Sequence, residues 1–255
     1  ERSLLVVSGG GGGAGYVYPG SYEALERNGL LPDLMVGTSI GSLMSLFRAR
    51  RKRYDSAPLV AAAKRLAWSK VFRVLEAESR YGLPASLQLY LHDVLGNLFQ
   101  NADGEPLRIS ETEIPMFSVV TGITVDALKH DLDYYEQLIG VEMRSSGVRS
   151  RVRAVFKVVG MLREFLGRRD ALREIVIGQT PGTEQFNALD AAGFSSAIPG
   201  VIHYDVLRDA PEMTRILNEL YADYGITRLG EGGMVSNVPA QVAWNTAMSG
   251  RLGRR

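Results

Sequence analysis

The 255-residue sequence has no cysteine, only three histidines and almost no excess of charge. Without cysteine there can be no disulfide, no thiolate metal site and no cysteine nucleophile. A formal net charge of +1, from 29 basic and 28 acidic residues, gives no reason to expect a nucleic-acid partner. No apolar run approaches the roughly 18 residues of a membrane-spanning helix, and the first residues do not resemble a signal peptide. We therefore expect a protein of the cytoplasm or of a membrane surface, not one exported by the Sec route.

What the sequence does contain is typical of one α/β domain. Residues 3–7 and 34–36 are short apolar runs that predict buried strands, and each is followed by a helical pattern, at 20–28 and 41–50. This alternation predicts a parallel sheet with helices on its faces. Because no internal repeat or linker interrupts the chain, we expect a single domain over residues 1–255.

The segment Gly37-Thr38-Ser39-Ile40-Gly41 follows the second apolar run directly. A G-x-S-x-G pattern between a strand and a helix is typical of a nucleophile elbow, a sharp turn that exposes the serine Oγ at the helix N-terminus. Glycine would be needed at both ends because a Cβ there would crowd the turn. The helix dipole at this point favours developing negative charge. Ser39 is therefore the candidate nucleophile, and an ordinary strand–turn–helix is the alternative.

The first predicted strand leads into a glycine-rich stretch, Gly9–Gly15. Glycines let the main chain approach a ligand closely and let successive amides converge on one anion, so we expect an anion-binding loop; a flexible loop is the alternative. The spacing Gly10-x-Gly12-x-x-Gly15, with Asp33 further along, also fits a dinucleotide-binding fingerprint. The acid of that fingerprint ends the second strand, however, whereas Asp33 precedes it.

The rest of the chain predicts further elements and two basic stretches. Helices are expected at 57–76, 84–99, 183–192, 211–224 and from Pro239 to 248, strands at 116–121 and 226–229, and a small-residue loop at 193–200. The basic run 48–53 suits a helix C-terminus and a solvated face, and a membrane or phosphate contact is its alternative. Residues 148–169 predict a basic amphipathic helix that packs on the core, or else lies on an anionic bilayer or covers the site.

A serine nucleophile needs a group that accepts its proton. In a serine–acid–histidine triad the histidine comes late in the chain, but His92, His130 and His203 lack a catalytic context, so we expect structural roles for them. A carboxylate can serve instead when it lies within hydrogen-bond reach in a dry site. Glu231 is the best-placed candidate, because it follows a predicted strand and precedes two glycines. The alternative is a surface acid at the end of a strand.

Separate segments then match one family, in that family's order. Gly10–Gly15 is similar to the G-G-G-x-[RK]-G oxyanion loop of the patatin-like phospholipases, and Gly37–Gly41 is similar to their nucleophile elbow. Glu231-Gly232-Gly233-x-x-x-Asn237-x-Pro239 resembles their D-G-G-x-x-x-N-x-P segment. Residues 195–200 resemble the A-S-x-A-x-P-G loop that precedes it. The resemblance runs from residue 4 to about 245, although between about 54 and 180 only the strand at 116–121 contributes.

The resemblance implies a three-layer α/β/α fold with a mainly parallel sheet, and a lipid acyl hydrolase that needs no metal or cofactor. It implies that Ser39 attacks an acyl carbonyl while Glu231 takes its proton. The oxyanion would be held by the amides of Gly10, Gly11, Gly12 and Gly13, and the turns would depend on Gly15, Gly37, Gly41, Gly232 and Gly233. The implied substrate is a phospholipid or lysophospholipid at a membrane surface.

The sequence departs from the family pattern at several points. Glu231 stands at the family's aspartate position, and a misplacement of about 1 Å can cost about 100-fold in rate. The dyad is therefore reshaped, weakened or deliberately inactivated. Ala14 stands at the basic position of the loop, and the chain stops at Arg255, where the family continues with another strand, as a fragment would. These departures favour a second hypothesis, a patatin-like protein that binds lipid or a partner and barely turns over.

Overall fold

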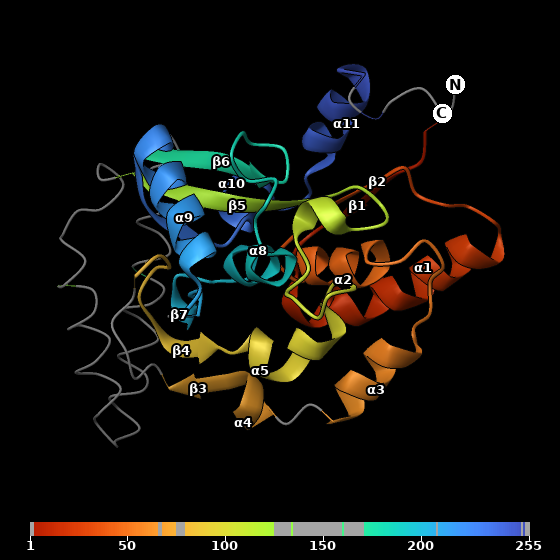
Figure 1. Cartoon of the computed structure of the whole chain (residues 1–255), viewed down its shortest axis with the longest axis horizontal. Helices are drawn as coiled ribbons and strands as arrows, with labels where there is room; N and C mark the ends of the chain where they lie inside the picture. The colour runs from red at the N-terminus through yellow and green to blue at the C-terminus, as the bar shows by residue number, and fades with distance from the viewer. Residues whose placement is uncertain are drawn as a thin grey trace.

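A computed structural model describes residues 3–65, 68–74, 80–124, 134, 160, 171–207, 209–250 and 252. Its central sheet contains β1 (Leu5–Ser8), β2 (Leu34–Thr38), β5 (Met116–Thr124), β6 (Leu172–Ile177) and β8 (Ile226–Gly230) (Figure 1). The strands β1, β2 and β5 are parallel to one another, and β6 and β8 join β5 in the antiparallel sense. The part of the sheet that carries the first two predicted strands is therefore parallel, as expected.

Helices cover both faces of this sheet, which confirms the expected three-layer α/β class. On one face, α2 (Ile40–Ala49) and α8 (Ala188–Ser195) pack against the central strands. On the other face lie α10 (Gly233–Ser236) and α11 (Ala240–Met248). Alternate residues of β2 serve the two layers, because Met35 belongs to the large core cluster on the α2 side, whereas Leu34 and Val36 cluster with α11 residues.

The remaining helical segments surround this framework. They are η1 (Gly12–Tyr16), α1 (Val17–Arg27), α3 (Ala57–Arg65), α4 (Trp68–Val71), α5 (Leu91–Leu95), η2 (Gly96–Leu98), η3 (Ile109–Glu111) and α9 (Pro211–Tyr224). The bounds predicted for α9 are confirmed, with Pro211 in the first turn and Gly225 in the left-handed conformation after the last. None of the helices in the described ranges combines the length and apolar character needed to cross a bilayer.

Two predicted helices are partly wrong, because a second, three-stranded sheet takes residues from both. It consists of β3 (Phe72–Val74), β4 (Ala85–Leu89) and β7 (Gly200–His203). The predicted helix at 57–76 therefore breaks into α3 and α4 and ends in a strand. The predicted helix at 84–99 begins as a strand and becomes helical only from Leu91. Leucines at 87, 91, 95 and 98 suit helical spacing, but Leu87 pairs with Val74 across the sheet.

The helix expected at 183–192 is displaced toward the C-terminus. It begins at Ala188 because the Asn187 side chain caps it, accepting the amides of Leu189 and Asp190 at 2.9 and 3.1 Å. It continues to Ser195, so the first three residues of the loop predicted at 193–200 are helical. This shift matters for function, because the last residue of α8 reaches the candidate site.

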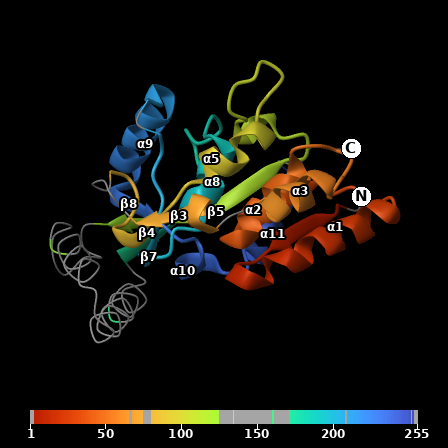
Figure 2. The same cartoon turned by 90° about the horizontal axis from the view of Figure 1, so that it is seen from below.

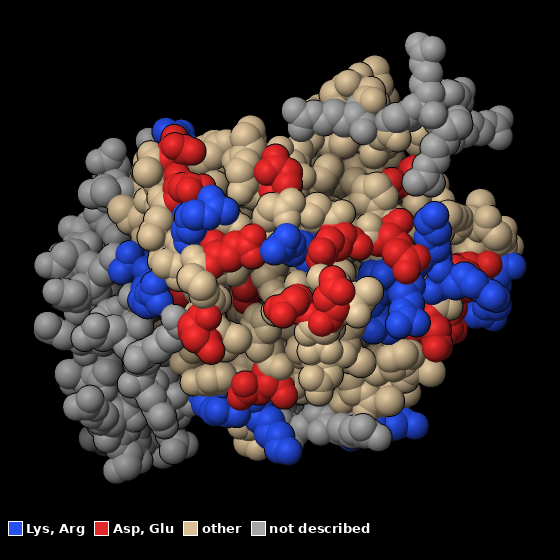
Figure 3. Space-filling model, viewed as in Figure 1, with Lys and Arg blue, Asp and Glu red and all other residues tan. Residues whose placement is uncertain are grey.

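The basic run 48–53 is not one solvated face. The Arg48 side chain is fully buried, and its guanidinium lies 3.2 Å from the Glu26 carboxylate and donates to the carbonyls of Arg51 and Lys52 at 3.0 Å. Burial lowers the pKa of Arg48, and the charge of Glu26 opposes that shift. The prediction of a solvated run is therefore wrong for Arg48. In Figure 3 positive side chains gather toward the end that carries α1 and α3, with acidic ones beside them.

Replacing Arg48 by alanine is expected to lower the free energy of unfolding by about 3 kcal/mol, because it removes a buried cation and leaves its partners unsatisfied. The matched substitution Arg51→Ala, at an exposed position of the same run, is expected to change it by less than about 0.5 kcal/mol. Urea unfolding of both variants measures the difference. Equal effects would mean that Arg48 is solvated in solution.

Apart from Gly160, the predicted basic amphipathic helix at 148–169 lies outside the described residues, as does His130.

Candidate active site

Two strands end facing each other alongside β5. β2 runs parallel to β5 and ends with Thr38 opposite Val119, while β8 runs antiparallel and ends with Gly230 opposite Thr121. Because β6 pairs with the other edge of β5 over this stretch, β2 and β8 share one edge of it. The residues that follow the two strands are Ser39 and Glu231. The topology thus brings together two candidates that lie far apart in the sequence.

Ser39 occupies a strained turn. It has φ 56° and ψ −133°, and it is the one non-glycine residue with positive φ in the described part of the chain. The residue is 7% exposed, and it stands at the N-cap of α2. A Cβ at Gly41 would lie 2.1 Å from the Ser8 carbonyl oxygen, and one at Gly37 would lie 2.4 Å from the Ser42 Cα. Close packing therefore leaves no room for a side chain at either glycine.

Glu231 reaches Ser39. The Ser39 hydroxyl and the Gly233 amide are close enough to its carboxylate to lower the carboxyl pKa. The Glu231 backbone is held by Thr121, whose hydroxyl donates to the Glu231 carbonyl at 2.7 Å. A Cβ at Gly233 would lie 2.8 Å from both carboxylate oxygens, and one at Gly232 would lie 2.1 Å from the Val119 carbonyl. Burial raises the pKa of the Glu231 carboxyl, against the opposing effect of the Ser39 hydroxyl and the Gly233 amide.

The glycine-rich loop lies over the same serine. A Cβ at Gly10 would be 3.1 Å from the Ser39 Cβ, and η1 and α1, into which this loop continues, pack beside α2 (Figure 2). The Gly10 amide donates to the Asn237 carbonyl at 3.0 Å, so that donor is already used. Gly11, Gly12 and Gly13 are exposed, and because they lie at the start of η1 their amides have no acceptor within that helix. Gly15 packs against Ile40, and the Ala14 side chain is outside the description.

A sequence model of the patatin-like phospholipase family matches residues 5–244. The chain belongs to this family. Lysophospholipase NTE1 of Candida glabrata is 28% identical over 150 residues, which are 58% of this chain and 8% of that protein. The chain therefore spans only a small part of this relative's length. The family model thus relates the chain to lipid hydrolases of the patatin type.

The patatin-like chain does not place Asp33 where a dinucleotide would need it. Asp33 accepts the Leu4 amide at 2.8 Å and donates its own amide to the Leu4 carbonyl at 2.9 Å. It therefore joins the amino ends of β1 and β2, at the opposite end of these strands from the glycine-rich loop. The dinucleotide alternative is wrong on this geometry.

The two histidines within the described residues are engaged away from the patatin elbow. The His203 ring lies 2.9 Å from the Leu83 carbonyl and is 1% exposed. His92 Nε2 lies 2.7 Å from a carboxylate oxygen of Asp190, which also accepts the Tyr204 hydroxyl at 2.5 Å. Both contacts agree with the structural roles expected from the sequence.

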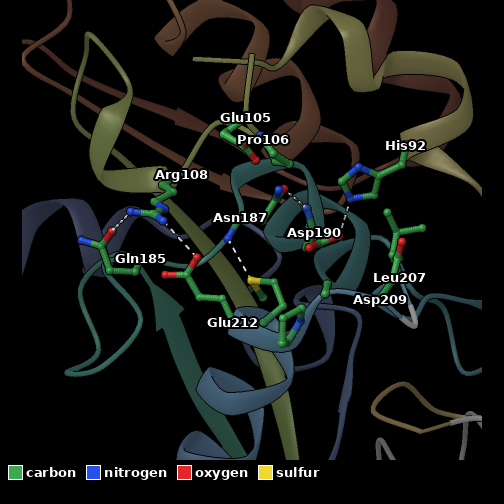
Figure 4. A pocket seen from close by; sticks show the side chains of 13 residues that line it. His92, Glu105, Pro106, Arg108, Gln185, Asn187, Asp190, Leu207, Asp209 and Glu212 are labelled. Atoms are coloured by element: carbon green, nitrogen blue, oxygen red, sulfur yellow. Dashed lines mark hydrogen bonds and ion pairs between the residues drawn. The ribbon is translucent and has the colours of Figure 1, made fainter. Parts of the chain in front are cut away.

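A cavity of about 450 Å³ adjoins His92 (Figure 4). Residues that line the cavity form the ion pairs His92–Asp190, at 2.7 Å, and Arg108–Glu212, at 2.9 Å. Ser39 and Glu231 do not line it, although α8 links the two places, with Asp190 in its first turn and Ser195 at its end. In this patatin-like domain the cavity is thus separate from the candidate dyad.

The His92–Asp190 pair predicts a pH-dependent loss of stability on Asp190→Asn. Burial lowers the pKa of His92, but the hydrogen bond and charge of Asp190 outweigh burial and raise it above 6.5. The pair therefore contributes fully below pH 6.5, and its contribution is lost as the pH rises through the raised pKa. We expect a cost of about 3 kcal/mol at pH 6 and a smaller one at pH 9. Glu212→Gln, on an exposed pair, is the control; a pH-independent cost for Asp190→Asn would contradict the assignment.

Sequence reasoning missed two residues that hold this patatin site together. Asn237 uses its carbonyl to bind the Gly10 amide, and its side chain lies against Gly10 and Gly233. Ser195 donates its hydroxyl to the Val119 carbonyl at 2.6 Å and accepts the Ser39 amide at 2.8 Å. Both stand in segments that carry the family resemblance, which was the signal available. Their partners become visible only in the fold.

Proposed function

We propose that this chain hydrolyses carboxylic esters of membrane lipids through a Ser39–Glu231 dyad. The observation that carries the proposal is the placement of Ser39 and Glu231 directly after the facing ends of β2 and β8 on one edge of β5, where the Ser39 hydroxyl is close enough to the Glu231 carboxylate to lower its pKa. A carboxylate whose pKa is raised by burial is a stronger base than an exposed one, which suits it to accept the serine proton. Family membership supports the reaction class.

The reaction proceeds in two steps. Ser39 Oγ attacks the acyl carbonyl carbon while Glu231 takes the hydroxyl proton, and the same proton then passes to the leaving alcohol. The acyl-enzyme is hydrolysed when Glu231 deprotonates a water molecule, and the fatty acid leaves as Ser39 regains its proton. Each step uses groups of the chain and water.

The oxyanion of both steps would be held by main-chain amides of the Gly10–Gly13 loop. Within this loop the amides of Gly11, Gly12 and Gly13 are the better donors, because that of Gly10 is bonded to Asn237. A well-aimed donor is worth about 3 kcal/mol to the transition state. The N-terminus of α2 adds a favourable dipole next to the reacting atoms.

We propose a phospholipid or lysophospholipid as substrate and a membrane surface as its source. Exposed apolar side chains flank the glycine-rich loop: Tyr16 is 81% exposed, Val17 52% and Val238 61%, and Val238 contacts Gly9. Apolar and aromatic groups at the mouth of a site suit contact with acyl chains. The relative's name, lysophospholipase, favours single-chain lipids as substrates.

A second candidate function is lipid binding with little turnover. It is favoured by the glutamate at the family's aspartate position and by Ala14 in the oxyanion loop. Under this proposal the site would retain lipid on vesicles without releasing fatty acid.

The test is incubation with vesicles of mixed phospholipid and lysophospholipid, followed by analysis of free fatty acid. In parallel, a fluorophosphonate probe is added and the labelled peptide is identified by mass spectrometry. We expect fatty-acid release and a single adduct on Ser39. Vesicle binding without release or labelling would support the second candidate, and an adduct on another residue would overturn the first.

A further inference from the structure

Ser195 is placed to hold both halves of the proposed dyad. It is the last residue of α8 and is 0% exposed. Its hydroxyl lies between two neighbouring strands, donating to the Val119 carbonyl of β5 at 2.6 Å and accepting the Ser39 amide at the end of β2 at 2.8 Å. The hydroxyl therefore joins β5 to the end of β2, where the chain turns at Ser39 from the strand into α2.

The backbone around Ser195 holds the other half. The Gly232 amide donates to the Ser195 carbonyl at 3.2 Å, and the Glu231 amide donates to the Ala197 carbonyl at 3.0 Å. Gly232 also packs against the Val119 carbonyl that receives the Ser195 hydroxyl. The Ser195 hydroxyl thus fixes the backbone of Ser39, and the carbonyls of Ser195 and Ala197 fix the backbone of Glu231 and Gly232.

The strained conformation of Ser39 gives this contact its importance. A non-glycine residue keeps a strained positive φ only where several surrounding contacts hold it in that conformation. The Ser39 amide lies in a buried turn, and a buried amide without an acceptor is unfavourable. A serine hydroxyl can donate and accept at once, and it is short enough to fit at the end of a packed helix.

We propose that Ser195 is a positioning residue, which sets the separation and direction of the Ser39 hydroxyl relative to the Glu231 carboxylate. This inference rests on the proposed function. Removal of the hydroxyl would take away the acceptor of the Ser39 amide and one donor to the Val119 carbonyl, and so release the turn at Ser39. Displacement of a nucleophile by about 1 Å can cost about 100-fold in rate.

The chain offers a matched control in Ser118. Its hydroxyl is also fully buried, joins β5 to α8 by donating to the Ala191 carbonyl at 3.1 Å, and pairs with the Ser42 hydroxyl at 2.6 Å. It makes no hydrogen bond to the Ser39 amide. Ser118→Ala therefore disturbs the packing of β5 against α8 but leaves the hydrogen bond between the Ser39 amide and the Ser195 hydroxyl in place.

The experiment compares Ser195→Ala, Ser195→Thr and Ser118→Ala with the parent chain. Three quantities are measured: the melting temperature, kcat and KM on soluble p-nitrophenyl butyrate, and residue-resolved amide exchange of Ser39. We expect Ser195→Ala to lower kcat by about 10- to 100-fold with KM changed less than about threefold, and to speed Ser39 exchange at least about tenfold. Ser118→Ala should change kcat less than about threefold, and Ser195→Thr, which keeps the hydroxyl, should lie closer to the parent than Ser195→Ala.

Equal kcat for Ser195→Ala and Ser118→Ala, or unchanged Ser39 exchange, would overturn the inference. If Ser195→Ala does not fold, Ser195→Cys replaces it, because a thiol has similar size and is a weak hydrogen-bonding group. Ser39→Ala is run in the same series. Full hydrolysis by that variant would overturn the proposed function, while the exchange data would still decide whether Ser195 holds the turn.

Discussion

Replacing Ser39 by alanine is expected to lower kcat for ester hydrolysis by about 10⁴-fold or more. Loss of a serine nucleophile removes the covalent route altogether, and the residual rate comes only from the oxyanion donors and substrate binding. The fold should persist, because Ser39 is held by its backbone through Ser195 and by the packing of Gly37 and Gly41. The measurement is fatty-acid release from lysophospholipid micelles at saturating substrate.

The matched control is Ser21→Ala, which removes an exposed hydroxyl on α1 that donates to the Val17 carbonyl. It should leave kcat unchanged. Retention of more than about a tenth of the parent rate by Ser39→Ala, at comparable melting temperature, would exclude Ser39 as nucleophile. The lipid-binding candidate would then become the better account of the site.

Replacing Glu231 by glutamine is expected to lower kcat about 10³-fold, because the amide keeps the size of the side chain but cannot accept the serine proton. In the parent, the acid limb of kcat/KM against pH should reflect Glu231 and lie above 4.5, since burial raises the pKa of this carboxyl. Activity should rise with pH through that value, as the carboxylate forms. The variant should lack this limb.

The same substitution should raise stability at neutral pH. An acid whose pKa is raised by folding destabilises the folded protein wherever it is charged, and this cost disappears as the pH falls below 4.5. The melting temperature of Glu231→Gln should therefore exceed that of the parent at pH 7, and the difference should shrink toward pH 4. A lower melting temperature at pH 7 would contradict the assigned cause of the pKa shift.

Glu231→Asp tests whether glutamate is the working residue. The Glu231 carboxylate is near enough to Ser39 for the serine hydroxyl to lower its pKa, and an aspartate carboxylate would lie about 1 Å further away, so we expect a loss of about 10- to 100-fold. Higher activity in Glu231→Asp would mean that the chain is a weakened form of a serine–aspartate enzyme.

The sequence predicted the local parts of the site and not their arrangement. Ser39 and its flanking glycines are recognisable because the elbow is a local pattern, in which packing over a few residues dictates residue type. The pairing of Glu231 with Ser39 depends on β2 and β8 sharing one edge of β5, which no local pattern encodes. The family resemblance supplied that link, and spacing alone left Glu231 as one of two alternatives.

The wrong predictions about the fold have the same origin. The leucines between 87 and 98 satisfy helical spacing, yet residues 85–89 are a strand because β3 and β7 are available to pair with them. Arg48 lies within a basic run that suggests solvent, yet carbonyls and Glu26 enclose it. In each case a partner distant in the sequence outweighs the local preference.

The shared edge of β5 also sets the distance between the ends of β2 and β8. Only Val120 separates the residue opposite the end of β2 from the residue opposite the end of β8. One residue more or less in β5 would change the gap between the two strand ends by about 3.3 Å and would turn the following side chains to the other face. The length of this one strand segment therefore fixes how far apart the two proposed catalytic residues lie.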